Sequence, residues 1–236
     1  LCGTTKSHKG SKDREMIRFD QEEAHIRMKL DRDGSSYSID MHLKKNRPKG
    51  IAINGVPIRK AGELLGLGNF VFFSPEDLNI IKSGPGERRR FMDLELCQLS
   101  KVYLFQLSNY NKILNQRNKL LKEIMFRPEY LDTLDVWDRQ LVQYGERVIR
   151  EREKFVGRLN EIIGEIHQRL SGGRETLVIH YEKNVEPEEF EARLTANRDR
   201  DLKLRTTQAG PSASISAVWI SGNSVPRGSS VRQRFL

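Results

Sequence analysis

Two acidic residues in the first half of the chain have the chemistry to approach a nucleotide. Glu76 and Asp77 follow a continuously apolar run, residues 70–73, which predicts a strand buried on both faces. Ligands of open α/β sheets collect at the carboxyl ends of strands, so these carboxylates could approach a Mg²⁺-bound nucleotide. They could equally complement the N-terminus of the helix that Ser74 and Pro75 predict. Both interpretations stay open.

Basic residues in two predicted helices have the chemistry to contact nucleic-acid phosphate. Arg88, Arg89 and Arg90 are consecutive, so about 100° of helix rotation separates each from the next and they cannot all face one partner. We predict phosphate contacts for Arg88 and Arg90. A basic stripe further along the chain has the same chemistry, although a solvated helix face is the commoner explanation for such a stripe. Its predicted contacts are Arg117, Lys119 and Lys122.

No catalytic or metal-binding residues are predicted. The phosphate-binding pattern Gly-x-x-x-x-Gly-Lys-[Ser/Thr] does not occur in the chain. Two distant cysteines, Cys2 and Cys97, indicate neither a disulfide framework nor a zinc site. Four histidines have neither metal-like spacing nor a nucleophile partner, so we interpret them as structural or surface residues: His25, His42, His167 and His180.

The composition favours a protein with long solvated helices and a polyanionic partner. Of the 236 residues, 37% are hydrophobic and 31% are charged, and the formal net charge is +9. Positive charge of this size suits nucleic acid, although many basic proteins bind none. No run of about 18 apolar residues occurs, so we expect no membrane span. The chain opens on no leader pattern, which favours the cytoplasm.

The elements that must position these residues divide into a strand-rich part and a helical part. Alternating apolar residues on either side of Asp33-Gly34 and Asn54-Gly55 predict hairpins with tight turns. From Leu96 the apolar residues recur at steps of three and four as far as Leu170, interrupted near Pro128. This pattern predicts two heptad-like helices that form an antiparallel hairpin. A strand at 176–181 and a helix at 187–197 are expected to follow.

Two segments resemble the RecF family, bacterial ATP-binding proteins of DNA repair that are built like the heads of SMC proteins. The first runs through Phe73–Lys82 and Gly84–Asp93, and the second is Tyr110–Lys122. The resemblance extends from Lys6-Ser7-His8 to Gly210-Pro211. It implies an α+β fold, namely a partial ABC/SMC-type ATPase head with β-hairpins and a buried strand, and with an inserted antiparallel helical-hairpin arm.

This resemblance implies a division into four parts. We predict part of the ATPase head at 1–98, the helical arm at 99–171, a return strand and helix of the head at 172–211, and an aberrant or disordered tail at 212–236. The tail is rich in serine and contains arginine, but it has no Lys, Asp or Glu. The family's His-Arg-Asp-Asp and Gly-Ser-Gln-Gly-Gln-Gln-Arg motifs do not occur there. We hypothesise a divergent or frameshifted C-terminus.

For the whole family, the resemblance implies a cytoplasmic protein that uses ATP and Mg²⁺ and binds gapped or single-stranded DNA. Such a protein forms an ATP-dependent homodimer and helps RecO and RecR load RecA in recombinational repair, replication restart and the SOS response. The resemblance places Glu76 and Asp77 at the position of a Q-loop, although no Gln stands there. Lys6, His8 and Lys9 match a family Lys-Ser-His-Arg element that would contact phosphate, although a plain basic loop is an equal alternative.

The missing ATP-binding motifs predict a chain that cannot hydrolyse ATP alone. Neither a Walker A loop nor an acidic Walker B strand end is found, so the sequence looks like an internal fragment, and we expect it to bind no cofactor. Leu170-Ser171-Gly172-Gly173 has the letters of an ABC signature, but a helix precedes it and a strand follows. We therefore predict a glycine cap that ends the long helix.

One alternative function belongs to a different class. The helical hairpin could be a scaffold that pairs with a partner coiled coil and does not bind DNA. Arg117 and Arg152 occupy inward positions of the heptad pattern and could set the pairing register. Salt dependence would separate the two functions, because phosphate binding weakens steeply with ionic strength and an apolar seam does not.

Overall fold

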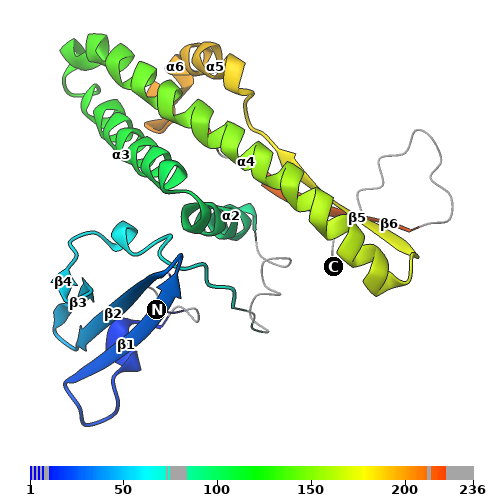
Figure 1. Ribbon diagram of the computed structural model, residues 1–236. Coiled ribbons are helices and arrows are strands. Elements are labelled where there is room, and N and C mark those ends of the chain that lie inside the picture. Colours follow the sequence, from blue (N-terminus) through cyan, green and yellow to red (C-terminus); the bar gives the residue numbers. More distant parts are fainter. Residues whose placement is uncertain are drawn as a thin grey trace. The chain divides into compact units, whose positions relative to one another are not determined.

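The computed structural model describes residues 1, 3, 5, 7, 11–72, 74, 84–211 and 214–221 (Figure 1). The chain divides into two compact units. Unit 1 comprises Leu1–Leu78 with Cys97–Lys101, and unit 2 comprises Asn79–Leu96 with Val102–Leu236. Among the helices of the described residues, none is both long and apolar enough to cross a bilayer.

Unit 1 contains a four-stranded antiparallel sheet in the order β1-β2-β3-β4, formed by Glu23–Arg32, Ser35–Lys44, Arg47–Ile53 and Val56–Pro57. Short 3-10 turns lie at Asp13–Met16 and Ala61–Glu63. The predicted turns are confirmed. Asp33 and Gly34 have φ of 51° and 76°, and Asn54 and Gly55 have φ of 51° and 79°. Positive φ at both central residues is what a tight hairpin turn requires.

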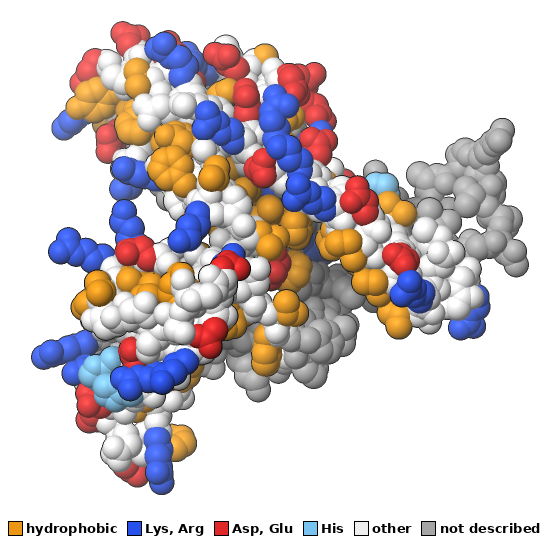
Figure 2. Space-filling model, in the orientation of Figure 1, with side chains coloured by type: hydrophobic (Ala, Val, Ile, Leu, Met, Phe, Trp, Pro, Cys, Tyr) orange, Lys and Arg blue, Asp and Glu red, His pale blue; other side chains and the backbone are white. Residues whose placement is uncertain are grey.

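The sheet of unit 1 has one apolar and one polar face, as its alternating sequence predicts. Ile39, Met41 and Leu43 on β2 are buried, and Leu64 from the following turn packs on the same side. The opposite face carries the charged and histidine residues of β1 and β2. Figure 2 shows histidine side chains with lysine and arginine beside them on this part of the surface.

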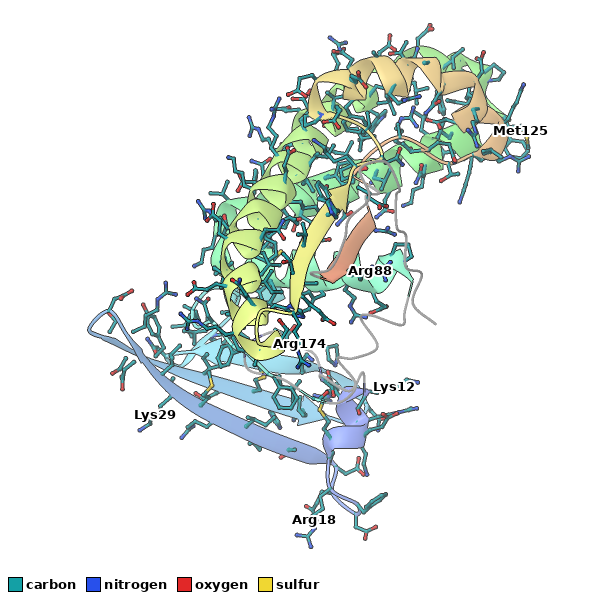
Figure 3. The ribbon with its side chains drawn as sticks, turned by 90° about the vertical axis from the view of Figure 1, so that its right-hand side faces the viewer. Lys12, Arg18, Lys29, Arg88, Met125 and Arg174 are labelled. Atoms are coloured by element: carbon teal, nitrogen blue, oxygen red, sulfur yellow. The ribbon has the colours of Figure 1, made fainter. Side chains whose placement is uncertain are left out.

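Unit 2 is built on the predicted helical hairpin. Helix α3, Lys101–Glu123, and helix α4, Leu134–Ser171, lie antiparallel, and the 3-10 segment Pro128–Thr133 joins them (Figure 1). Met125, labelled in Figure 3, lies at the tip. With 38 residues, α4 is about 57 Å long. Helix α2, Pro85–Leu99, directly precedes α3 in the chain.

The glycine cap of α4 is confirmed. Gly172 and Gly173 have left-handed φ of 64° and 76°. The amide of Gly172 donates to the carbonyl of Arg169, and the amide of Gly173 donates to the carbonyl of Gln168 at 2.8 Å. These bonds satisfy carbonyls that the end of a helix otherwise leaves unpaired. The Leu-Ser-Gly-Gly letters therefore end a helix here and do not begin one.

The rest of unit 2 returns along the hairpin. Strand β5, Glu175–Glu182, and helix α5, Phe190–Ala196, confirm the predicted strand and helix, and a further helix α6, Arg198–Leu204, was not predicted. Strand β6, Ser214–Ser221, pairs antiparallel with β5. Of the tail that we predicted to be aberrant or disordered, these eight residues form a strand and so are not disordered. A run rich in β-branched and aromatic residues pairs readily with an exposed strand edge. Residues 222–236 lie outside the described part.

The predicted buried strand at 70–73 is not formed in its described portion. Residues 70–72 have no strand geometry, and Val71 and Phe72 are 94% and 65% exposed. The amide of Phe70 donates to the side-chain oxygen of Gln98 at 3.0 Å instead of to another strand. An apolar run becomes a strand only where a neighbouring strand supplies ladder hydrogen bonds. None of the described strands pairs with residues 70–72. Phe73 itself is outside the described residues.

Candidate nucleic-acid interface

The basic stripe of α3 separates into two opposite faces. Lys112, Lys119 and Lys122 are exposed, whereas Arg117 has no exposed surface. Lys112 and Lys119 are one heptad apart and therefore nearly aligned, and Lys122 follows one turn later. Arg117 precedes Lys119 by two residues, or about 200° of rotation, so it points the other way. The three lysines form the α3 lysine face.

The prediction that Arg117 contacts nucleic acid is inconsistent with its position. Its Nε donates to Oδ1 of Asp138 at 2.6 Å, and its Nη1 donates to Oδ2 of Asp201 at 2.7 Å and to the hydroxyl of Thr207 at 2.8 Å. The side chain has 0% exposure, so no phosphate can reach it in this arrangement. An inward heptad position places it between helices, where two carboxylates neutralise it.

Further hydrogen bonds orient the partners of Arg117. Asn118 accepts bonds from both the amide and the hydroxyl of Thr207, at 2.9 and 2.8 Å. Arg198 donates to the second oxygen of Asp138 at 2.8 Å and also bonds Asp135. The hydrogen bond with Asp138, followed by that with Asp135, raises the pKa of Arg198. These contacts join α3, α4, α6 and the segment after α6.

Arg152 is the other inward arginine of the heptad pattern, and it is also held within unit 2. Its guanidinium donates to both oxygens of Asp93 at 2.9 Å, to the hydroxyl of Tyr103 at 3.0 Å, and to the carbonyl of Pro211. Burial alone would lower the pKa of Arg152, but Tyr103 and Asp93 raise it and the net direction is upward. Burial raises the pKa of Tyr103. Neither inward arginine needs a partner coiled coil to neutralise it.

The other predicted phosphate contacts fall into two groups. Arg90 on α2 is exposed and lies 3.8 Å from Glu87, and Arg88, labelled in Figure 3, is half-buried on the same helix. Lys6, His8 and Lys9, and the nucleotide-proximal pair Glu76 and Asp77, lie outside the described residues. Within the described part of unit 2, Arg90 and the α3 lysine face are therefore exposed, and Arg88 is half-buried.

Sequence reasoning missed the residues that bind the two inward arginines. Asp138 and Asp201 are 21 and 84 positions from Arg117, and Asp93 is 59 positions from Arg152. One signal was present, because a charged residue at an inward heptad position must be paired when it is buried. Nothing in the local pattern shows which acid supplies the pair.

The fold belongs to the class of ABC ATPase-type heads. Its antiparallel sheet, long helical hairpin and mixed α+β composition are the features that define this class. No protein-family model matches the chain. Individual proteins nevertheless match it over most of its length. The chain is 61% identical over 211 residues to the DNA replication and repair protein RecF of Agathobacter rectalis, covering 89% of this chain and 58% of that protein. It is 55% identical to RecF of Lachnoclostridium phytofermentans, covering 99% of this chain and 65% of that protein.

Solved structures agree with these relatives. The recombination mediator protein RecF with ATP, in the RecFOR pathway, superposes with a TM-score of 0.85 at 33% identity, covering 93% of this chain and 61% of that one. The RecF-ATPrS structure has a TM-score of 0.83. Over most of its length the chain is a RecF-like sequence with a RecF-like fold. It spans about three fifths of the length of the relatives and structures it matches.

Proposed function

We propose that this chain forms part of a cytoplasmic RecF-like, ATP-dependent DNA-binding protein that acts in recombinational repair of gapped or single-stranded DNA. The likeness to RecF with ATP, at a TM-score of 0.85 over 93% of the chain, is the observation that carries the proposal. The pathway named for that structure supports RecO and RecR as partners. Support for RecA loading and ATP-dependent dimerisation comes from the family resemblance. The scaffold alternative is not favoured, because both inward arginines have acidic partners within this chain.

The residues of this chain do not suffice to hold ATP. The sequence has no Gly-x-x-x-x-Gly-Lys-[Ser/Thr] pattern, so no such loop and lysine are available to bind the β- and γ-phosphates. We retain Glu76 and Asp77 as candidates for residues near the nucleotide, on the strength of the resemblance alone.

The proposed DNA contacts include five cations of unit 2. Lys112, Lys119 and Lys122 share a face of α3, and like charges on one face attract a phosphate backbone without reading its sequence. Arg88 and Arg90 on α2 are the other proposed contacts in this unit. From the resemblance we add a loop at the start of the chain: Lys6, His8 and Lys9.

Salt-dependent DNA binding tests this proposal. Fluorescence anisotropy of labelled gapped duplex and single-stranded oligonucleotides, titrated with the full chain at several salt concentrations, should show affinity that falls steeply with salt. Lys119→Gln/Lys122→Gln removes two candidate phosphate contacts. It should reduce the log–log salt slope by roughly 1.8 on duplex and about 1.4 on single strands.

A matched variant separates this surface from a general loss of charge. Lys45→Gln/Lys154→Gln also removes two positive charges, but each of these lysines lies 2.9 Å from a glutamate oxygen, on Glu22 and Glu151 respectively. It should leave the slope nearly unchanged. An equal decrease of the salt slope in the two double variants would show that the α3 lysine face does not contact DNA. A wild-type affinity that does not change with salt concentration would contradict phosphate binding altogether.

A further inference from the structure

The polar face of the sheet in unit 1 brings together three side chains that are known metal ligands in proteins. His25 on β1 lies directly opposite His42 on β2 in the strand register. Glu23 precedes His25 by two residues, so it projects from the same face. One potential ligand atom from each of the three lies within 4.8 Å of the others. The histidines are distant in the sequence and are brought together by the pairing of β1 with β2.

The distances within this cluster are close to those of a coordination site. Nε2 of His42 lies 2.9 Å from Oε2 of Glu23, and Nε2 of His25 lies 3.8 Å from Oε1 of the same carboxylate. The two imidazole rings are stacked, with centroids 3.9 Å apart and planes inclined by 23°. Ligand atoms about 2.1 Å from one ion lie about 3 to 4 Å from each other, so small side-chain rotations suffice.

The surroundings of the cluster leave room for an ion and its remaining ligands. A hollow of about 550 Å³ adjoins it, lined in part by both histidines and by Gly50, which pairs with His42 and has no side chain to fill the space. Two cations lie near the cluster. Arg27 bonds Asp40, and Lys44 lies 3.3 Å from Oε2 of Glu23. A metal ion would take the place of the Lys44 ammonium group at that oxygen.

We propose that Glu23, His25 and His42 form a surface site for a divalent transition-metal ion, with Zn²⁺ as the representative. Two imidazoles and one carboxylate suit Zn²⁺, Cu²⁺ and Ni²⁺, whereas Mg²⁺ and Ca²⁺ favour oxygen ligands alone. Three protein ligands leave at least one coordination position open to water or to another molecule. The site belongs to unit 1, whereas the α3 lysine face belongs to unit 2.

Calorimetric titration of the full chain with Zn²⁺ tests this site, with Co²⁺ absorption in the visible range as a second readout of coordination. We expect one equivalent of Zn²⁺ and a rise in melting temperature, because the ion binds the folded sheet and not the unfolded chain. His25→Ala/His42→Ala should abolish both effects. Glu23→Gln, at a half-exposed position, should weaken binding by about 10-fold or more.

The control uses the histidines of the other unit. His167→Ala/His180→Ala also removes two imidazoles, but His167 lies beside a single carboxylate, that of Glu175 at 3.8 Å, so Zn²⁺ binding should be unchanged. Circular dichroism shows whether each variant is folded. If His25→Ala/His42→Ala does not fold, Glu23→Gln still tests the site. Failure of the wild-type chain to bind Zn²⁺, or equal binding by His25→Ala/His42→Ala, would overturn the proposal.

Discussion

Arg117 on α3 and Asp201 on α6 form an ion pair in which neither side chain is exposed, with Nη1 of Arg117 2.7 Å from Oδ2 of Asp201. Taking two charges out of water costs several kcal/mol for each ion unless other hydrogen bonds complete their environment. Here Asp138 and Thr207 accept from Nε and Nη1 of Arg117, and the amide of Gln208 donates to Asp201, while Nη2 of Arg117 is buried with no hydrogen-bond partner among the described residues. The pair therefore joins the helical hairpin to the segment that returns along it.

Removal of the arginine should strongly destabilise unit 2. Arg117→Met leaves Asp201 buried without its cation, and such losses cost about 3–5 kcal/mol. Chemical denaturation followed by circular dichroism measures the change in the free energy of unfolding. Lys119→Met is the matched control, because the same residue type replaces an exposed cation two positions away and should change stability by at most about 0.5 kcal/mol. Similar effects of the two substitutions would contradict a structural role for the buried pair.

Two glycines of α4 should respond in opposite directions to alanine. At Gly145, an added Cβ would lie 2.4 Å from the ring of the buried Phe190 and 3.1 Å from Tyr110. Gly145→Ala should therefore destabilise by about 1–3 kcal/mol through overpacking. At Gly157 a Cβ meets nothing within 4 Å, so Gly157→Ala should stabilise by about 0.5–1 kcal/mol through helix propensity. Thermal melts of both variants check the difference in sign.

Features that depend on neighbouring residues could be predicted from the sequence. The Asp33-Gly34 and Asn54-Gly55 turns need only positive φ at adjacent positions, and the hairpin of α3 and α4 follows from a sustained apolar period. The cap at Gly172 follows from the same local chemistry. In each case the determining interactions lie within a few residues of each other along the chain.

Features that depend on distant partners could not be predicted. The exposed position of Lys119 and the burial of Arg117 differ because acids on α4 and α6 reach only one face of α3. The run at 70–72 lacked the neighbouring strand that its apolar character requires. The pairing of His25 with His42, in contrast, follows from the register that the Asp33-Gly34 turn sets. Sequence patterns give the elements and the pairing of adjacent ones, but not the side-chain contacts between residues far apart in the chain.

Glu95 on α2 should make stability depend on pH in the opposite direction to a salt-bridged acid. Burial raises the pKa of this carboxyl above its ordinary value. The folded state therefore binds more protons than the unfolded state between the two pKa values, and the free energy of unfolding falls as pH rises through that window. Glu95→Gln should be more stable than wild type at neutral pH, and the difference should shrink below the unfolded pKa. Denaturation at pH 4 and pH 7 measures it, and a Gln variant less stable at pH 7 would exclude a burial penalty.

Tyr103 should contribute to loss of stability in alkaline solution. Its buried hydroxyl donates to Asp93 and accepts from Arg152 Nε, and burial raises its pKa above the ordinary tyrosine value. Above that ordinary value the unfolded chain loses this proton while the folded chain keeps it, so the free energy of unfolding falls with rising pH. Tyr103→Phe should cost about 1 kcal/mol at pH 7 through the lost hydrogen bonds. In denaturation experiments between pH 10 and 11, the free energy of unfolding of Tyr103→Phe should fall less steeply with pH than that of wild type. The difference in slope should correspond to roughly one proton. Parallel curves for the two proteins would show that the hydroxyl ionises as readily in the folded state as in the unfolded chain.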